Sequence, residues 1–350
     1  MKNLFVGELR KNVKKSALIG VCVALVVVLV LAAVIYNLLH NTLKEIINDA
    51  LQESGQTSAM FPENDGYEIG KDQLDREIEK YEQYVSELQE KYKDNKKLYG
   101  ELFEAKNTLN ALKYAEKNGY YDKEVRILGY NYSVSAMNAE GLVSVYSSIA
   151  GVILLIYGIV LASGIYSKEY RFGTIKLVMS KPIKKNALTT AKLLTVYATI
   201  GVLYLVSVLI AYVYGAVAFG TDATAKVIYG FNATSAGIST AGAFAFADIF
   251  MTLVQMLVMS TIAFALGTLS RKYAIGLLAL VLVFLNIGGL LNYIGVTAFL
   301  LSNSFDLLCF FGMGTVVRNG NFFLSVGIIV FWTAAALAST YVVTKKRDAF

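Results

Sequence analysis

Long apolar stretches alternate with polar segments along most of the chain, and this pattern predicts its topology. Each apolar stretch has 22 or more residues, enough for a helix to cross about 30 Å of hydrocarbon. Between the fourth and fifth stretches lie only Ser270, Arg271 and Lys272, and two adjacent cations favour a tight turn over one continuous helix. We therefore expect an all-α polytopic membrane protein with six transmembrane helices, at residues 17–39, 142–166, 193–219, 243–269, 273–294 and 322–343.

The largest polar segment, residues 40–141, predicts a helical domain outside the membrane. Within it, apolar positions repeat at alternating spacings of four and three, which predicts a coiled coil over about 72–118. Two forms fit this pattern: one helix of about 45 residues, or an antiparallel hairpin that turns near residues 94–100, which the turn-forming residues there favour. After Gly119, β-branched and aromatic residues at 124–134 predict a short strand pair. The heptad positions are Leu74, Ile78, Tyr81, Val85, Leu88 and Tyr92.

Four shorter segments complete the chain. Residues 1–16 place apolar side chains among Lys and Arg, which is typical of an amphipathic helix on the membrane surface or, alternatively, of a disordered basic tail. We expect residues 220–242 to form an outer loop and residues 344–350 to form a short cytoplasmic tail. Residues 295–321 are apolar but broken by Gly, Asn and Asp, and we expect a re-entrant pair of short helices there.

Charge fixes the expected orientation. With the N-terminus in the cytoplasm, the inner segments carry 17 Lys and Arg against three acidic residues, whereas residues 40–141 carry 13 basic and 20 acidic residues. Positive charge concentrates on the cytoplasmic side of membrane proteins, so both termini are expected inside the cell. The formal charge of +6 is the sum of these two faces and indicates contact with membrane lipid, not with nucleic acid. We expect a multi-pass protein of the cell membrane, most simply a bacterial cytoplasmic membrane.

The residues give no sign of an enzyme active site. No phosphate-binding loop, paired carboxylates, nucleophile–base arrangement or metal cluster is evident, so we expect no catalytic residue, no metal and no cofactor in this chain. The spans are also nearly free of charge. The polar residues Gln255, Asn286 and Asn292, with Asp248 near the outer end of its span, either bond neighbouring helices or line a substrate path. A transporter without its own ion site needs energy from elsewhere.

The segment between Ser167 and Lys185 is the most informative part of the sequence. It holds six Lys or Arg residues between two apolar stretches, and each would cost roughly 2.5 to 3.5 kcal/mol at the bilayer centre. The segment must therefore stay in water while its neighbours enter lipid. A short, structured loop of this kind can receive force from a partner protein, although it can also simply lie on lipid headgroups.

Glu169-Tyr170-Arg171-Phe172-Gly173-Thr174-Ile175-Lys176, followed by Ser180-Lys181-Pro182, resembles the E-x-x-x-G-T segment of ABC-2 type permeases. The N-terminal elbow, the six spans and the re-entrant pair are also similar to that family. The resemblance implies a half-transporter that pairs with a second permease copy or paralogue and with two ABC ATPase subunits, which bind ATP and Mg. It further implies a cytoplasmic coupling helix within residues 167–192 that docks into a cleft on the ATPase.

In that reading, Glu169 and Arg171 are the charged anchors of the coupling segment, and Gly173 permits a tight start to its helix. Ile175, together with Leu177 and Val178, would give an apolar contact face. Tyr170, Thr174 and Lys176 complete the expected ATPase-coupling residues.

The large outer insertion departs from compact members of that family and is similar to insertions in the phage-infection-protein branch. Two functions therefore follow from the sequence. The first is a permease of an ATP-driven exporter for a hydrophobic or amphipathic substrate such as a peptide, lipid or drug. The alternative is a membrane-anchored scaffold, receptor or secretion-system component whose outer coiled coil binds an envelope protein.

Overall fold

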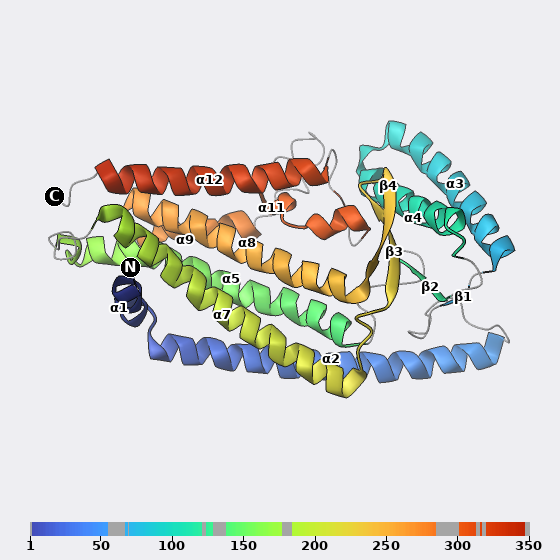
Figure 1. Ribbon diagram of the computed structural model, residues 1–350, viewed down its shortest axis with the longest axis horizontal. Helices are drawn as coiled ribbons and strands as arrows, with labels where there is room; N and C mark the ends of the chain where they lie inside the picture. The colour runs from blue at the N-terminus through green and yellow to red at the C-terminus, as the bar shows by residue number, and fades with distance from the viewer. Residues whose placement is uncertain are drawn as a thin grey trace.

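A computed structural model of the chain describes residues 2–54, 67–68, 70–120, 124–128, 138–176, 184–284, 301–312, 316 and 320–346. These residues are predominantly helical, as expected, and form a bundle of long helices with a smaller domain at one end (Figure 1). The helices of the bundle and its N-terminal elbow are α1 (Lys2–Asn12), α2 (Lys15–Ser54), α5 (Ala139–Arg171), α7 (Lys185–Phe219), α8 (Ala241–Ser270), α9 (Tyr273–Phe284) and α12 (Phe322–Lys346).

Five of these helices are long and apolar enough to cross a membrane, which supports a multi-pass protein. Each contains one of the predicted apolar stretches. The candidate spans are Lys15–Ile35, Ala139–Arg171, Lys185–Phe219, Ala241–Ser270 and Phe322–Lys346.

The predicted fifth span, residues 273–294, is only partly covered by the structure. Its first half forms α9, a helix of 12 residues. Residues 285–294 lie outside the described part of the chain, so the sixth crossing stays a prediction. In the expected re-entrant region, the described residues form two short helical turns, α11 (Leu301–Ser304) and η3 (Leu307–Phe311).

Helix α5 is the centre of the bundle and packs mainly against α7 and α8. Its contact with α8 is close at Gly267, where an added Cβ atom would lie 2.7 Å from the carbonyl oxygen of Ser163. Only glycine fits such an approach between two backbones. Helices α2 and α12 lie at the edges, and much of their apolar surface faces outward.

Both chain ends lie at the same end of the bundle. Helix α1 and the C-terminal end of α12 are found there, whereas the small domain lies at the opposite end (Figure 1). Following the orientation expected from charge, we call these the inner and outer ends.

The small domain contains two helices, α3 (Lys71–Asp94) and α4 (Tyr99–Lys117), joined by the short turn η1 (Lys96–Leu98). They pack against each other, so the structure has the helical hairpin and not the single long helix. The predicted heptad positions lie in the shared core, with Leu74 and Leu88 almost fully buried. The Tyr84 hydroxyl donates to the Glu101 carboxylate across the hairpin at 2.6 Å, and this bond raises the pKa of Tyr84 to about 12.

A small mixed β-sheet joins this hairpin to the bundle. From the sequence we expected an all-α protein with only one short strand pair, so the four-stranded sheet corrects that expectation. Its strand order is β1 (Tyr67–Glu68), β2 (Glu124–Ile127), β3 (Lys226–Phe231) and β4 (Ser235–Thr240). Strand β2 pairs in parallel with β3, and β3 pairs antiparallel with β4. Of the strand pair predicted over 124–134, the structure describes only β2, which pairs with β1 and with the segment that we had expected to be a plain outer loop. Residues 129–134 lie outside the described part of the chain. The outer domain is therefore built from two separate insertions.

Candidate site at the inner end of the bundle

The inner end of α5 turns sharply at Gly173. The amide N–H groups of Phe172 and Gly173 donate to the carbonyl oxygens of Lys168 and Tyr170 at 3.0 and 3.2 Å. Gly173 has φ +67°, a left-handed conformation that costs other L-residues roughly 1–2 kcal/mol. This glycine fixes the direction in which the chain leaves α5 toward α7.

Four charged side chains from three helices meet beside this turn, and we call them the ion cluster: Glu8 and Lys11 of α1, Glu169 of α5 and Lys192 of α7. Lys192 Nζ donates to Glu169 Oε1 at 2.7 Å and to Glu8 Oε2 at 2.9 Å. Lys11 Nζ also donates to Glu169 Oε1. Lys192 is 0% exposed, Glu169 3% and Glu8 6%, so these three charges are shielded from solvent, whereas the Lys11 side chain is 44% exposed.

The ion cluster is electrically balanced, with two cations and two carboxylates. This balance matters because burying a charge without a partner costs several kcal/mol, roughly 3–5 when one member of a buried pair is removed. One acceptor is left over, since Glu169 Oε2 has no hydrogen-bond partner among the described residues. A cluster of this kind adds little net stability, but it strongly restricts how α1, α5 and α7 can move relative to one another.

Neighbouring side chains hold the cluster in place. The Tyr166 ring centroid lies 5.0 Å from Lys192 Nζ, and the Tyr166 hydroxyl lies 2.9 Å from Thr189 Oγ1 on α7. On α1, Asn12 Nδ2 donates to Glu8 Oε2 at 2.9 Å. Aromatic, hydroxyl and amide groups therefore complete the shell around the charges.

The structure places the predicted coupling residues in two groups. Glu169 and Ile175 are buried, and Tyr170 and Thr174 are half-buried. The exposed residues are Arg171, Gly173 and Lys176. Leu177 and Val178, expected on the apolar contact face, lie outside the described residues.

This placement corrects the expectation that Glu169 and Ile175 face a partner. The Glu169 carboxylate is directed at Lys192 and Lys11 inside the protein. Ile175 packs into the hydrophobic core of the bundle. The physical reason is that the helical turn after Gly173 folds back against the bundle instead of projecting from it.

Sequence reasoning missed Glu8, Lys11 and Lys192. For Lys192 a signal was present: it lies four residues from Leu188 and from Val196, both buried, and is therefore a lone cation on the apolar face of α7. Glu8 also carried a signal as the one acidic residue of segment 1–16.

The sequence matches the profile of ABC-2 family transporter proteins over residues 3–349, nearly the whole chain. The chain belongs to the ABC-2 transporter family. No curated protein and no solved structure matches it. As an ABC-2 permease with several apolar helices, it is a multi-pass cell membrane protein and a transport component, and its family works with ABC ATPase subunits.

The candidate substrate-path residues of the permease are only partly placed. Gln255 is half-buried on α8, whereas Asn286 and Asn292 lie outside the described residues. Near the outer end of α8, Asp248 Oδ2 accepts a hydrogen bond from Ser144 Oγ of α5 at 2.7 Å.

Hydroxyl groups connect the three central helices of the permease. Ser147 Oγ of α5 lies 2.7 Å from the Tyr204 hydroxyl of α7, and it donates to Thr252 Oγ1 of α8 at 3.4 Å. Further inward, the Tyr197 hydroxyl of α7 contacts Thr261 Oγ1 of α8. These neutral contacts hold α5, α7 and α8 together without charges in the membrane interior.

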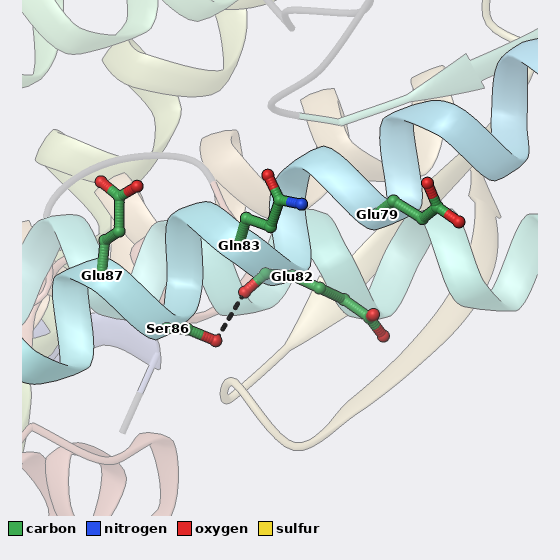
Figure 2. Close-up of a pocket in the computed structure, with 5 residues that line it drawn as sticks. All are labelled: Glu79, Glu82, Gln83, Ser86 and Glu87. Atoms are coloured by element: carbon green, nitrogen blue, oxygen red, sulfur yellow. Dashed lines mark hydrogen bonds between the residues drawn. The ribbon is translucent and has the colours of Figure 1, made fainter.

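The outer domain of the permease carries a shallow pocket on the exposed side of α3 (Figure 2). Its lining residues all belong to this one helix, and Ser86 Oγ donates to the carbonyl oxygen of Glu82 at 2.8 Å. Within the part of the chain that the structure describes, no group of three or more His, Cys, Asp or Glu is arranged to hold a metal ion. The pocket is an open acidic surface, lined by Glu79, Glu82, Gln83, Ser86 and Glu87.

Proposed function

We propose that this chain is the permease subunit of an ATP-driven exporter that moves a hydrophobic or amphipathic substrate, such as a peptide, lipid or drug, across the cell membrane. Separate ATPase subunits bind ATP and Mg and hydrolyse the nucleotide, and this chain supplies no catalytic group. The observation that carries the proposal is the buried ion cluster beside the α5–α7 connection.

The ion cluster supports a role in force transmission. A partner that pushes on the connection between α5 and α7 acts on two helices whose inner ends are already joined by Lys192 and Glu169. Lys192 also holds Glu8, so the elbow helix α1 follows the same movement. The three helices then respond as one body, which is what a lever between an ATPase and the membrane helices requires.

A rigid link also reaches the outer domain. Strand β4 ends at Thr240 and α8 begins at Ala241, without an intervening loop. The Thr240 side chain caps α8 by accepting from the Ala243 amide at 3.3 Å. Movement of α8 is therefore passed directly to the sheet and the helices that cover it.

Six membrane crossings fit the course of the chain. Helix α8 runs from the sheet to the inner end, and α12 runs from Phe322, beside Phe231 of β3, back to the inner end. The chain must return outward between them, and α9 with the residues that follow it is the segment available for this crossing. An even number of crossings keeps both termini in the cytoplasm, as charge predicts.

The interior of the bundle favours an amphipathic substrate over an ion. The hydroxyls of Ser147, Tyr204 and Thr252 offer polar contacts, and Asp248 adds an acidic group near the outer end of α8. The remaining surface is apolar. A second permease copy or paralogue would complete the path between two half-transporters, with membrane lipid on the outward faces of α2 and α12.

The scaffold alternative is less well supported. The family match runs from residue 3 to residue 349 and so includes the inner segment as well as the spans. A simple anchor would also gain nothing from a buried, balanced ion cluster that joins three helices at the inner end. Binding of an envelope protein by the outer domain is compatible with transport and does not replace it.

The test is to purify the chain with its associated ATPase and measure ATP hydrolysis in proteoliposomes. Glu169→Gln and Lys192→Met should lower the coupled ATPase rate at least several-fold while both subunits remain present. Lys117→Met, an exposed cation at the end of α4, serves as the matched control and should leave the rate unchanged. Absence of any ATPase from the wild-type preparation would refute the proposed function.

A further inference from the structure

The sheet of the outer domain ends in a strand whose outer edge pairs with no other strand among the described residues. The strand order is β1-β2-β3-β4, so β4 pairs with β3 on one side only. All six residues of β4 are exposed or half-buried, whereas Val227 and Ile228 of β3 are buried. Along this edge β4 presents backbone N–H and C=O groups with which a further strand can pair.

The edge of β4 lacks the features by which proteins block such pairing. Exposed edge strands commonly carry a charged side chain, a proline or a bulge. The sequence of β4 is Ser-Ala-Gly-Ile-Ser-Thr, with no charge and no proline. Its register with β3 runs one to one, from Phe231 opposite Ser235 to Lys226 opposite Thr240, without a bulge. An unprotected edge of this kind indicates a strand that another strand covers in the assembled protein.

The sheet lies across the axis of the bundle. One of its faces packs on the membrane helices, where the ring centroid of Tyr229 lies 5.4 Å from that of Phe244 of α8. The other face packs on the outer hairpin, with Ile228 in the hairpin core and Gly230 against the backbone of Asn107. Figure 1 shows β3 and β4 between the bundle and α4, running across the long helices. The perpendicular to the sheet therefore points roughly along the bundle axis, and so along the membrane normal.

This orientation suits pairing with a second copy of the same strand. Two copies inserted the same way round in one membrane are related by a rotation about the membrane normal. A half-turn about an axis perpendicular to a sheet keeps a strand in the plane of the sheet and reverses its direction. It brings β4 of the second copy alongside β4 as an antiparallel neighbour. Because β4 carries no charge, this pairing sets no like charges opposite each other.

We propose that two copies of the chain associate through β4, which pairs antiparallel with β4 of the second copy and makes one continuous sheet across both outer domains. The inference rests on the proposed function, which calls for a second permease, and it selects a second copy of this chain over a paralogue because the twofold axis matches the strand with itself. Strand β4 runs directly into α8, so the contact also links α8 of one copy to α8 of the other.

Disulfide formation in native membranes tests this pairing. Single cysteines replace residues 235–239 one at a time in the full chain with Cys22→Ser, which leaves the buried Cys309 as the other thiol. Opposite Cα atoms of an antiparallel pair lie about 4.5–5.5 Å apart, within the range that a disulfide spans. One position, at the twofold axis, should form at least tenfold more disulfide-linked dimer than the parent. Ser86→Cys, on the exposed side of α3, is the matched control and should match the parent.

The antiparallel register supplies an internal check. If Gly237→Cys crosslinks to itself, cysteines at 236 and 238 should crosslink to each other when the two variants are co-expressed, and each alone should form less than a tenth as much dimer. Hydrogen–deuterium exchange of the unmodified chain is a second measurement. Amides of residues 235–240 should exchange at least tenfold more slowly in the dimer than in the monomer obtained by dilution in detergent, while those of residues 82–88 should not change.

Three results would overturn the inference: no dimer at any of the five positions, equal dimer at all of them, or a disulfide from β4 to a different protein. The proposed function is judged separately. If the permease exports and keeps its ATPase but no β4 cysteine crosslinks, the β4 contact is wrong and the exporter stands. If β4 crosslinks to itself but no ATPase accompanies the wild-type chain, the contact between copies stands and the exporter fails.

Discussion

Lys192 Nζ lies 2.7 Å from Glu169 Oε1, although the two residues belong to different membrane-spanning helices. The chain between them contains the whole connection from α5 to α7. This ion pair therefore closes a loop at its base, and a force applied to the loop is shared by both helices. Glu8 extends the same link to α1 through Lys192.

Lys192→Met should destabilise the permease strongly. The substitution leaves Glu8 and Glu169 as two buried carboxylates with only Lys11 to compensate them, and removing one partner of a buried pair costs about 3–5 kcal/mol. We expect a lower midpoint of thermal unfolding in detergent, measured by size-exclusion chromatography after heating.

The double variant Glu169→Gln/Lys192→Met is the informative control. Because the two groups contact each other, their effects should not add, and the double variant should be less destabilised than the sum of the single variants. Strict additivity would show that the two side chains act independently and would contradict the ion pair.

Replacing Gly173 should uncouple transport with only a small loss of stability. Its φ of +67° is strained for alanine, by roughly 1–2 kcal/mol, whereas asparagine enters this region more readily. Gly173→Ala should lower the coupled ATPase rate more than Gly173→Asn, because the turn at Gly173 sets the direction in which the chain leaves α5 toward α7. Gly201→Ala is the control, since nothing lies within 4 Å of an added Cβ atom there. Equal rates for the two Gly173 variants would argue against a conformational role.

Much of the fold was predictable because membrane insertion imposes a strong sequence signal. A helix at 142–166 or 243–269 needs an unbroken apolar stretch, and both stretches lie within helices of the structure, α5 and α8. The pairing of β2 with β3 was not predictable. It joins residues 124–127 to residues 226–231 across two membrane helices, and short strands carry no information about such distant partners.

The candidate site was also only partly predictable from the sequence. The motif marked Gly173 because its signal is local, but from the sequence we expected this glycine at the start of a coupling helix, whereas in the structure it directly follows the end of α5. The inward direction of Glu169 was not, because it depends on Lys192 and Glu8, which come from other helices and become neighbours only after the bundle packs. From the sequence alone, a charged residue in a basic loop is expected at the protein surface, and only the structure reveals that it is buried.

Close packing between α5 and α8 gives a third prediction. Gly267→Ala places a Cβ atom 2.7 Å from the Ser163 carbonyl oxygen, a backbone atom that cannot move aside easily. Overpacking of this kind costs about 1–3 kcal/mol. The variant should unfold at a lower temperature than the wild type, while Gly327→Ala on α12, where an added Cβ atom meets nothing within 4 Å, should match it. Equal stability of all three proteins would contradict the packing of α5 on α8.

Asn107 should control how firmly the outer helices are attached to the sheet. Its side chain is 1% exposed, accepts a hydrogen bond from the Ala233 amide at 2.8 Å and donates to the Phe310 carbonyl oxygen at 3.3 Å. It thereby joins α4 to the turn between β3 and β4 and to η3. Asn107→Ala leaves the half-buried Ala233 N–H without its acceptor, a loss of about 1 kcal/mol, at the low end of the range for a buried donor.

The expected result is faster hydrogen–deuterium exchange in the β3–β4 turn and in the first residues of α4, with unchanged exchange in α5 and α7. Asn118→Ala is the matched control, because Asn118 is exposed and its side-chain amide donates to the Tyr114 carbonyl oxygen within the end of α4.

If α8 carries force to the outer domain through β4, the Asn107 variant should also export less substrate per ATP hydrolysed, because the sheet then moves without the helices that cover it. Unchanged exchange in the β3–β4 turn would contradict the attachment, and faster exchange with unchanged export would show that the outer helices do not take part in transport.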